Sequence, residues 1–424
     1  MQGFFQKIGS VLVLASSSRG GSSFLAEILK RSPDLVHFTG EINPFLVKAG
    51  LVRPASDALS AEDACAARRK NLDALEAELS LDAGNPMGAR NMDDADLVRF
   101  KADLGRRFSM QWPEISLTAG ALSAKVDGVF EELRTTCGWK PGEFKEAALF
   151  HAFLLRNLRA DFPRINPYYY DLDPLLLQRH FPGVRPAFEP PSAAIVEEPP
   201  FVAASPWRPA SDDALRKRTL VIKTPSNAYR LPFLRALFPN ARLRVLHLTR
   251  NPAASVNGLY DGWRHHGFFS RRVTRPLNIA GYTDFFPAWA KEWWKFDLPP
   301  GWEKWADAPL ERVCGFQWSS AHNAVMDFIE KEKADAFRLR FEEAAGSGNL
   351  ELQRIQELAE WLGIDGKPIA EAVKGTMAPV MATRKPAKRR WAARADLLEP
   401  VLSDADVRET ARRLGYGMDR AQWL

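Results

Sequence analysis

The chain has 424 residues, more than one simple hydrophobic core usually serves, so two domains or one domain with a large insertion are expected. Its hydrophobic fraction of 46% and formal net charge of +6 indicate an ordinary, mildly basic protein, and this charge is too thinly spread to argue for nucleic-acid binding. The three cysteines have no paired spacing, which argues against a disulfide framework or a zinc site, and no apolar run is long enough for a transmembrane segment. We therefore expect a cytoplasmic enzyme.

The first predicted element is a buried strand at Ser10–Ala15, which runs into a polar turn, SSSRGGSS, and then into a helix at Ser22–Arg31. Glycines let the backbone approach a ligand closely, and N–H groups at a helix N-terminus bind anions. The turn therefore predicts an anion site, with a plain Ser/Gly turn as the alternative. The lysine of the usual nucleotide loop, GxxxxGKS/T, is missing, which argues against a standard ATPase or GTPase. The residues of the predicted anion site are Ser18, Arg19, Gly20, Gly21, Ser22 and Ser23.

A second strand is predicted at Leu35–Thr39 and ends in FTGEINPF, which places Glu41 at the rim of the sheet. A carboxylate at this point can act as a general base toward a substrate hydroxyl. A helix cap or a solvated side chain is the alternative.

Residues 51–215 then interrupt the alternation of strands and helices. Helical patterns at about 55–80, 92–108 and 142–160 are followed by a proline-rich stretch, Phe181–Pro209, which predicts a loop or an extended arm. We interpret 51–215 as a helical and proline-rich insertion that shapes an acceptor site. A separately folding helical domain is the alternative.

After the insertion, strands and helices alternate again. This pattern predicts an α/β fold with a central parallel sheet flanked by helices, formed by residues 1–50 and 216–424. The further strands are predicted at Thr219–Ile222, Leu243–Leu248 and Phe337–Phe341, and the helices at Leu231–Leu237 and Ala253–Leu259.

Two basic residues stand where these later strands end. Arg250 follows the strand Leu243–Leu248, and its guanidinium can bind a phosphate with two hydrogen bonds. Lys223 follows the strand before it, where a lone lysine is more typical of a solvated surface. Because ligands of open α/β sheets gather at the carboxyl ends of the strands, the coincidence of these residues with Glu41 and the polar turn predicts one site with two anion subsites.

Tryptophans are abundant from Trp289 to Trp318, which favours a structural core over an aromatic wall for a sugar or planar acceptor. His151 lies in an apolar helical pattern and is predicted to be a core or interface residue. His37 and His247 lie within predicted strands and are expected to be structural.

Taken together, these segments resemble the sulfotransferases that use 3′-phosphoadenosine 5′-phosphosulfate (PAPS), in the branch containing tyrosylprotein, bacterial and carbohydrate sulfotransferases. SSRGGSS is similar to the family's 5′-phosphosulfate loop, and GEINP to the segment that supplies its catalytic base. KTPSNAYRLPFLRALFPNARLRVLHLTRNP resembles the lysine segment and the 3′-phosphate strand. RLRFEE resembles a further family strand, and TRKPAKRRWAARADL resembles the basic loop that closes over the cofactor's 3′ end.

The resemblance implies a P-loop-nucleotide-hydrolase-like sulfotransferase fold and transfer of a sulfuryl group from PAPS to an acceptor hydroxyl. The product would be 3′,5′-adenosine bisphosphate (PAP), and no metal would be required. The family usually has a proline where this chain has Ser18, and a serine where it has Gly258, so Ser255 or Asn257 is expected to replace that serine. The implied catalytic residues are Arg19, Glu41 and Lys223, and the implied cofactor ligands beyond the polar turn are Arg250, Ser255, Asn257, Arg384, Lys385 and Lys388.

Several alternatives stay open. Some relatives use histidine as the base, so His265 and His266 compete with Glu41, and the cluster Arg384–Arg390 beside Trp391 could be a solvated basic face instead of a 3′-phosphate clamp. A kinase-like transferase, which would need Mg²⁺ and a nucleoside triphosphate, and an inactive nucleotide-binding scaffold are the other functions. The acceptor is expected to be a glycan, lipid, peptide or other alcohol or phenol.

Overall fold

The computed structural model describes most of the chain. The described residues are 3–51, 55–70, 72–88, 91–170, 172–186, 195–196, 203–265, 270–345, 348–375, 383–384, 386–417 and 423. Lys385 and His266, two residues singled out from the sequence, lie outside them.

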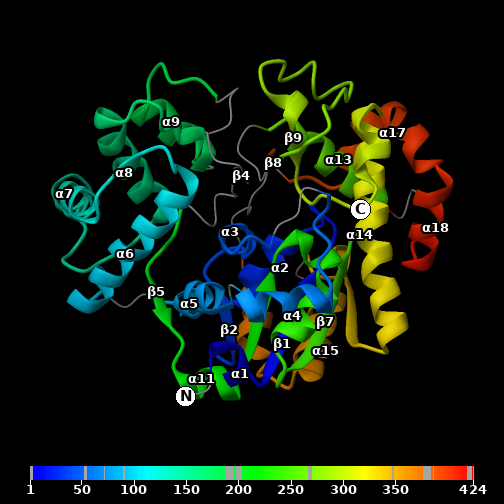
Figure 1. Cartoon of the computed structure of the whole chain (residues 1–424), viewed down its shortest axis with the longest axis horizontal. Coiled ribbons are helices and arrows are strands. Elements are labelled where there is room, and N and C mark those ends of the chain that lie inside the picture. The colour runs from blue at the N-terminus through cyan, green and yellow to red at the C-terminus, as the bar shows by residue number, and fades with distance from the viewer. Residues whose placement is uncertain are drawn as a thin grey trace.

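A seven-stranded sheet forms the centre of the molecule (Figure 1). The first five strands in its spatial order are parallel, and the last two are antiparallel to their neighbours. This mostly parallel sheet confirms the predicted α/β fold class, and each of the five predicted strands is present. In spatial order the strands are β10 (Asp335–Arg340), β7 (Arg242–Thr249), β1 (Ser10–Ala15), β6 (Thr219–Lys223), β2 (Leu35–Phe38), β3 (Ala83–Pro86) and β5 (Trp207–Pro209).

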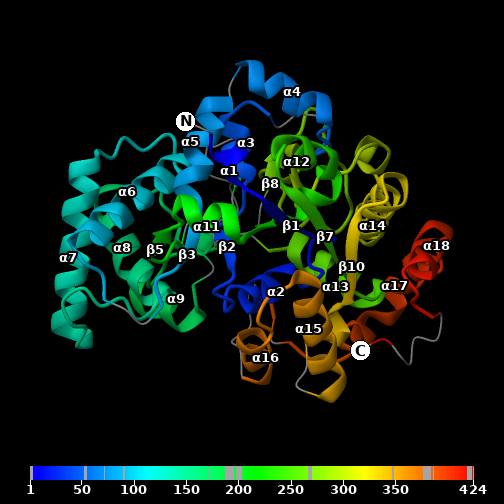
Figure 2. The ribbon, with the colours of Figure 1, turned by 90° about the horizontal axis from the view of Figure 1, so that it is seen from below.

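Helices cover both faces of this sheet, as Figure 2 shows. Side chains of β1 alternate between two apolar cores, with Val11 and Val13 in one and Leu12 and Leu14 in the other. This alternation is what a central strand buried on both faces requires. One face packs against α2 (Ser22–Leu29), α15 (Asn349–Leu362) and α16 (Lys367–Lys374), and the other against α12 (Leu231–Leu237) and α14 (Leu310–Glu332).

Parallel pairing aligns the carboxyl ends of the strands along one edge. Leu14 of β1 is in register with Lys223 of β6, and Arg340 of β10 with Thr249 of β7. The segments that follow each strand therefore meet at this edge. They include the start of α3 (Asn43–Lys48), η2 (Pro225–Tyr229), α13 (Pro252–Trp263) and η5 (Phe341–Glu343).

The segment between β2 and β6 supplies a second layer of helices and also the two antiparallel edge strands. Its helices α6, α7, α8 and α9 lie together at the left of Figure 1, whereas α4 packs on α12 and α5 packs on α3 and α1. The division into a core and an insertion at 51–215 remains a prediction. Of these helices, α1 (Phe4–Lys7) precedes β1. The helices that belong to the segment are α4 (Ala61–Lys70), α5 (Leu72–Asp82), α6 (Asp94–Gln111), α7 (Ala119–Cys137), α8 (Ala147–Asp161), η1 (Pro167–Tyr170), α9 (Pro174–His180) and α11 (Asp212–Lys217).

The sequence analysis missed α7. Thr118 caps its first turn through the N–H of Ala121, and Gly138 ends it in the left-handed conformation. The buried residues Leu122, Val126, Val129 and Leu133 have the spacing of an amphipathic helix, so the signal was present in the sequence.

A second, three-stranded sheet, in the order β4–β8–β9, lies above the carboxyl edge and carries the tryptophan cluster. Trp294 is fully buried and packs edge-on against Trp263 and Trp302, with ring centroids 5.0 and 5.5 Å apart. These contacts confirm the structural-core interpretation. The elements of this part are β4 (Ile195–Val196), β8 (Ser270–Arg272), η3 (Ala290–Glu292), β9 (Trp293–Lys295) and η4 (Trp302–Trp305).

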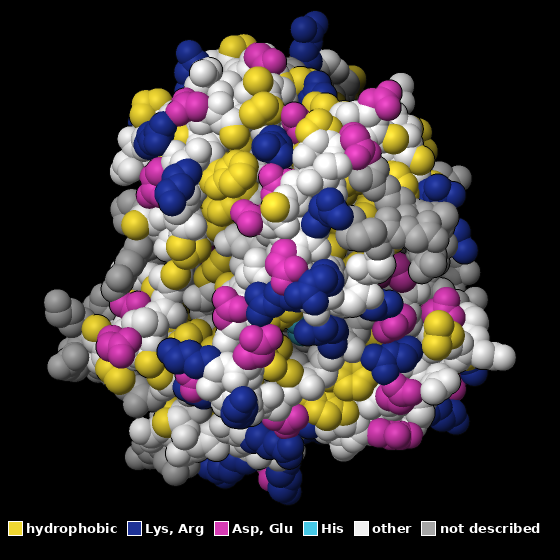
Figure 3. Space-filling model, turned by 90° about the vertical axis from the view of Figure 1, so that its right-hand side faces the viewer, with side chains coloured by type: hydrophobic (Ala, Val, Ile, Leu, Met, Phe, Trp, Pro, Cys, Tyr) yellow, Lys and Arg dark blue, Asp and Glu magenta, His cyan; other side chains and the backbone are white. Residues whose placement is uncertain are grey.

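The chain closes with η6 (Arg390–Arg394), α17 (Ala395–Leu402) and α18 (Ala405–Arg413), which pack against α13 and α14. Figure 3 looks onto the side that carries α17 and α18, where Lys and Arg side chains are interspersed with Asp and Glu. In the ranges given above, no helix combines the length and the apolar character needed to cross a membrane.

Asp82, at the end of α5, joins the helical layer to the sheet. Its buried carboxylate accepts hydrogen bonds from Arg107, from Arg106 at 3.1 Å and from the N–H of Thr39 at 3.1 Å. Arg107 is 1% exposed and its other carboxylate partner is Asp103 at 2.8 Å. The end of β2 is thereby tied to α6 through one buried charge.

Replacing Asp82 with Asn should destabilise the protein by about 3 kcal/mol, because it leaves the buried Arg107 guanidinium with one carboxylate partner in place of two. Urea unfolding of both proteins measures this difference. Asp127→Asn is the matched control, since its ion pair with Lys101 joins α6 to α7 at the surface and should be worth less than about 1 kcal/mol. Equal stability of the two variants would contradict the role given to Asp82.

Candidate functional site

The polar turn after β1 forms a tight loop. Its Ser17 carbonyl accepts a hydrogen bond from Gly20 at 3.1 Å, and Arg19 and Gly21 have φ angles of 63° and 98°. A Cβ at Gly21 would lie 2.1 Å from Cδ2 of Phe341, so this position requires glycine for both its conformation and its packing. The loop leads into α2, whose first N–H groups have no intrahelical acceptor, as the predicted anion site requires.

The arginine of this loop packs on one face of α13. Two glycines of α13 face the Arg19 side chain. A Cβ atom added at Gly258 would lie 3.4 Å from Cβ of Arg19, and a Cβ atom added at Gly262 would lie 3.5 Å from Cδ of Arg19. Ser255 lies one turn before Gly258 on the same face, and its hydroxyl is buried without a hydrogen-bond partner among the described residues. The side-chain oxygen of Asn257 accepts a hydrogen bond from Arg394 at 2.8 Å, and this bond does not use the Nδ2 donor that a phosphate would need. Both Ser255 and Asn257 therefore remain predicted replacements for the missing serine.

Glu41 and Lys223, predicted from separate strands, form an ion pair at the carboxyl edge. Glu41 is 2% exposed and the Lys223 side chain 14%, so the pair is shielded from water and its Coulomb attraction is strong. The structure thus brings the candidate base and the candidate lysine into direct contact.

The segment after β6 fixes the backbone that carries Glu41. Thr224 accepts a hydrogen bond from the N–H of Ile42 at 3.3 Å, and the Arg230 guanidinium donates to Asn43. Both contacts involve residues that directly follow Glu41 in the sequence, Ile42 and Asn43. The position of the carboxylate is therefore set by backbone and side-chain contacts as well as by its own ion pair.

Beneath this pair lies a buried charge network centred on Asp57. The Asp57 carboxylate accepts hydrogen bonds from Arg230 at 3.0 Å, from Arg271, from Ser226 at 2.7 Å and from the N–H of Leu298 at 2.9 Å. Two guanidiniums share this one carboxylate, and the charge of Glu41 lies close enough to act on Arg230. Burial lowers the pKa of Arg230, and the charge of Asp57 opposes that shift.

Asp297 lies behind the anion loop. Its carboxylate accepts hydrogen bonds from Ser18 at 2.5 Å and from the Tyr229 hydroxyl at 3.2 Å. Burial raises the pKa of Asp297 to about 6, the Ser18 hydrogen bond opposes this shift, and the charge of Asp57 adds to it. The Ser18 hydroxyl is therefore oriented by a carboxylate of the protein itself.

Arg250 marks the second predicted anion subsite, at the end of β7. Its guanidinium lies 4.5 Å from the ring of Phe341, and one nitrogen lies 3.5 Å from the carbonyl oxygen of Arg19. Its Nε is buried without a hydrogen-bond partner among the described residues, and burial lowers its pKa. Glu342 accepts hydrogen bonds from the N–H and the side chain of Asn251 and so fixes the start of α13.

The C-terminal basic cluster meets α13 through its last arginine and through Arg394 beyond it. Arg390 and Arg394, the first and last residues of η6, contact the Asp261 carboxylate of α13 at 3.0 and 2.7 Å. Arg384 is exposed and lies 3.9 Å from the same carboxylate, and Lys388 is exposed. A role of Arg384 and Lys388 as cofactor ligands stays a prediction.

Of the two histidines that compete with Glu41 as the base, only His265 lies in the described part of the chain. His265 is a half-buried residue just beyond the end of α13, and its carbonyl oxygen accepts a hydrogen bond from Lys295. His37 and His247 are buried, and burial lowers the pKa of His37 to about 3 and that of His247 well below its usual value. Both are neutral structural residues, as predicted.

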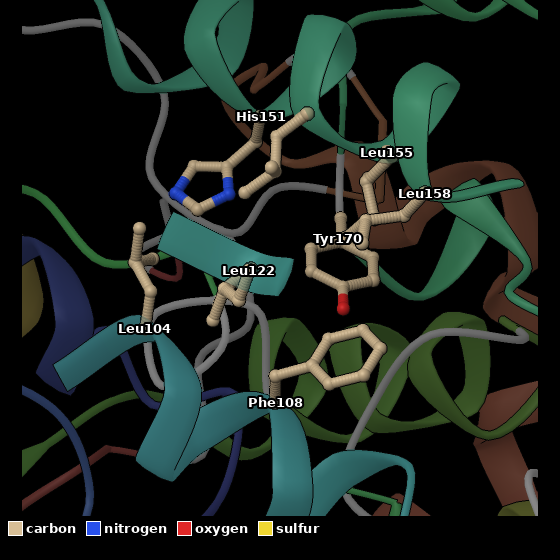
Figure 4. Close-up of a pocket in the computed structure, with 8 residues that line it drawn as sticks. Leu104, Phe108, Leu122, His151, Leu155, Leu158 and Tyr170 are labelled. Carbon is tan, nitrogen blue, oxygen red and sulfur yellow. The ribbon is translucent and has the colours of Figure 1, made fainter. Parts of the chain in front are cut away.

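A separate apolar pocket lies within the helical layer (Figure 4). His151 and Tyr170 face it, but the His151 ring bonds the carbonyl of Ala204 at 2.8 Å and the Tyr170 hydroxyl accepts from Trp112 at 2.9 Å. Burial lowers the pKa of His151 to about 4, so the histidine is neutral, and it is a core residue as predicted. This pocket suits an apolar group and carries none of the cations of the carboxyl edge. Its lining is Leu104, Phe108, Leu122, His151, Leu154, Leu155, Leu158 and Tyr170.

Three acidic residues of the site were not predicted from the sequence: Asp57, Asp261 and Asp297. The partners of each come from segments far apart in the chain, so no local spacing identifies them. Across the described ranges, no three His, Cys, Asp or Glu side chains are grouped as a metal site would need.

A family model described as "Sulfotransferase family" matches residues 12–297, which is more than half of the chain. No curated protein shows significant similarity to the sequence.

Two solved structures are similar over 97% of this chain. One is a sulfotransferase domain from the curacin biosynthetic pathway, with 10% identity, a TM-score of 0.37 and 99% of its own chain covered. The other is the sulfotransferase STF9 from Mycobacterium avium, with 12% identity, a TM-score of 0.36 and 78% of its chain covered.

The raised pKa of Asp297 predicts a pH-dependent contribution to stability. Because the folded state binds this proton more tightly than the unfolded chain, the carboxyl should add stability as the pH falls through about 6. Between pH 7.5 and 4.5 the wild type should gain about 2 kcal/mol relative to Asp297→Asn, which cannot titrate. Urea unfolding of both proteins across this range measures the difference, and a constant difference would contradict the shift.

Proposed function

The chain belongs to the sulfotransferase family, and we propose that it moves the sulfuryl group of PAPS to a hydroxyl of an acceptor and releases PAP. One observation carries the proposal: the loop after β1, the Glu41–Lys223 pair and Arg250 all lie at the carboxyl edge of the sheet, where Arg250 approaches the carbonyl oxygen of Arg19. The sequence order of these parts is that of the family that the chain resembles.

The 5′ side of the ligand would lie on the anion loop. Helix N-terminal N–H groups suit a phosphosulfate, and Arg19 brings a positive charge to the same place. The hydroxyl of Ser17 is buried without a hydrogen-bond partner among the described residues. An anion on this loop would find donors whose hydrogen bonds the protein itself does not satisfy.

The 3′ side would lie between Arg250 and Arg390. Each has a buried guanidinium nitrogen without a hydrogen-bond partner in the described part of the chain, and the charge of Arg390 contributes to the lowered pKa of Arg250, after burial. Two such cations close together favour a dianion between them. A 3′-phosphate meets this requirement, and Ser255 could supply a further donor.

Glu41 would accept the proton of the acceptor hydroxyl as the acceptor oxygen bonds to sulfur. The bond from sulfur to the bridging oxygen breaks, and the negative charge moves onto the phosphate of PAP. Protonation of Glu41 weakens its ion pair with Lys223, so the ammonium becomes available to the departing oxygen at the moment when charge develops there. Arg19 and the loop N–H groups would stabilise the same charge.

The helical layer beside β2 would shape the acceptor site, and a glycan, lipid, peptide or other alcohol or phenol remains the proposed class of acceptor. We also propose a cytoplasmic location, which the free state of Cys65, Cys137 and Cys314 supports. A kinase-like transferase remains the second candidate, because Lys223 and the loop would also suit a nucleoside triphosphate.

Thermal unfolding with PAP, and in parallel with ADP and Mg²⁺, tests the donor. A ligand at 100 times its dissociation constant adds about 2.7 kcal/mol to the stability of the folded state. We expect PAP to raise the melting temperature and ADP with Mg²⁺ to leave it nearly unchanged. A shift with ADP and Mg²⁺ alone would favour the kinase-like alternative.

Replacing Glu41 with Gln should lower sulfuryl transfer by about 10²–10⁴-fold, because the amide cannot accept the acceptor proton. PAP should still bind, since Glu41 contacts the lysine and not the phosphate sites. Transfer from radiolabelled PAPS to a panel of alcohols and phenols, together with PAP binding, measures both effects.

Glu292→Gln is the matched control for this variant, because Glu292 is an exposed partner of Arg272. It should retain both transfer and binding. Unchanged turnover in Glu41→Gln would assign the base to His265 or His266 instead.

A further inference from the structure

Asp261 is the carboxylate that Arg390 and Arg394, two arginines at the C-terminal basic cluster, contact. It lies in the third turn of α13, is 8% exposed, and contacts Arg390 at 3.0 Å and Arg394 at 2.7 Å. Both arginine partners of Asp261 belong to residues 386–394, here called the basic segment. This segment follows Asp261 by well over a hundred residues in the sequence. The buried carboxylate of Asp261 thus joins the basic segment to α13, the helix that follows Arg250.

The guanidinium nitrogens of Arg390 and Arg394 differ in their contacts. Arg390 uses Nη2 for Asp261, whereas its Nη1 is buried without a hydrogen-bond partner among the described residues. Arg394 uses Nη1 for both Asp261 and Asn257, and its guanidinium lies 5.2 Å from the ring of Tyr260. Asp261 and Asn257 are one turn apart on α13, so together they fix the direction of Arg394. Arg390 is then held on one edge and open on the other.

The local charges explain why such a tether is needed. Arg390 lies close enough to Arg250 for their charges to oppose each other, and Arg394 adds a third cation. Without Asp261, mutual repulsion would favour an outward position of the basic segment, and ligand binding would have to overcome both the repulsion and the entropy of ordering the segment. One carboxylate against several arginines still leaves a surplus of positive charge for an anion.

We propose that Asp261 is a positioning residue that holds the basic segment against α13, so that the open edge of Arg390 faces the 3′-phosphate of the donor nucleotide. The proposal rests on the proposed function and adds a determinant of nucleotide selectivity to it. Asp261 itself does not touch the ligand. Its removal should therefore weaken recognition of the 3′-phosphate selectively.

The test compares the binding of PAP and of adenosine 5′-phosphate, which lacks the 3′-phosphate, by isothermal titration calorimetry. In Asp261→Asn we expect the affinity for PAP to fall about tenfold and the affinity for adenosine 5′-phosphate to change less than about twofold, because only the 3′-phosphate meets Arg390. Asp327→Asn is the matched control, since its ion pair with Arg413 is exposed, and it should bind both nucleotides as the wild type does.

A double-mutant cycle with Arg390→Gln separates positioning from a general loss of structure. If Asp261 acts through Arg390, then Asp261→Asn should have little further effect on PAP affinity once Arg390 is replaced. Additive effects in the cycle would overturn the proposal. If the Asn variant does not fold, Asp261→Glu must show the same selective loss in smaller measure, because it keeps the charge and displaces it.

Three results would overturn the proposal while leaving the proposed function intact: tighter PAP binding in Asp261→Asn, unchanged PAP binding, or equal weakening of both nucleotides. Tighter binding would mean that the carboxylate competes with the phosphate for the arginines. If the wild type itself does not distinguish PAP from adenosine 5′-phosphate, the proposed function fails, and this inference fails with it.

Discussion

Buried positive charge at the carboxyl edge of the sheet is the constraint on which the rest of the site depends. A parallel sheet brings the ends of β1, β6 and β7 together, and these ends carry Arg19, Lys223 and Arg250. Cations cannot be removed from water without partners, so the fold supplies internal carboxylates. Glu41 pairs with Lys223, Asp57 with two arginines of the underlying network and Asp261 with those of the basic segment.

The two ends of the proposed donor site would bind their ligand groups in different ways. The 5′ end would depend on backbone geometry, because the loop needs glycine at Gly21 to pass the ring of Phe341 and to lead its N–H groups into α2. The 3′ end would depend on long side chains, whose directions must be set by other groups. Such side chains lose conformational entropy when they are ordered. A carboxylate such as Asp261 would order them before the ligand binds, so that the ligand does not have to offset this entropy cost.

The parts of this site that could be predicted from the sequence are those encoded locally. The strand at Ser10–Ala15 and the helix at Leu231–Leu237 have the predicted bounds, and the register of the sheet then brings Glu41 to Lys223. The carboxylate partners could not be predicted, because Asp57 and Asp297 meet residues from remote segments and no spacing reveals the pairing. For the basic cluster, a charge run does not say which of its arginines meets a carboxylate. It is Arg390, next to the buried Trp391, that lies 3.0 Å from Asp261.

The helical layer is connected to the chemistry through the end of β2. The Asp82 carboxylate accepts a hydrogen bond from the N–H of Thr39, which lies two residues before Glu41. The same carboxylate accepts hydrogen bonds from Arg106 and Arg107 of α6. A displacement of α6, for instance on binding of a large acceptor, would therefore act on the backbone that carries the base. The Asp82 network thus provides a physical route by which the layer that would shape the acceptor site can influence the position of Glu41, whereas the donor subsites depend on α13 and the basic segment. Binding of the acceptor and of the donor would then depend on two separate buried carboxylates, Asp82 and Asp261.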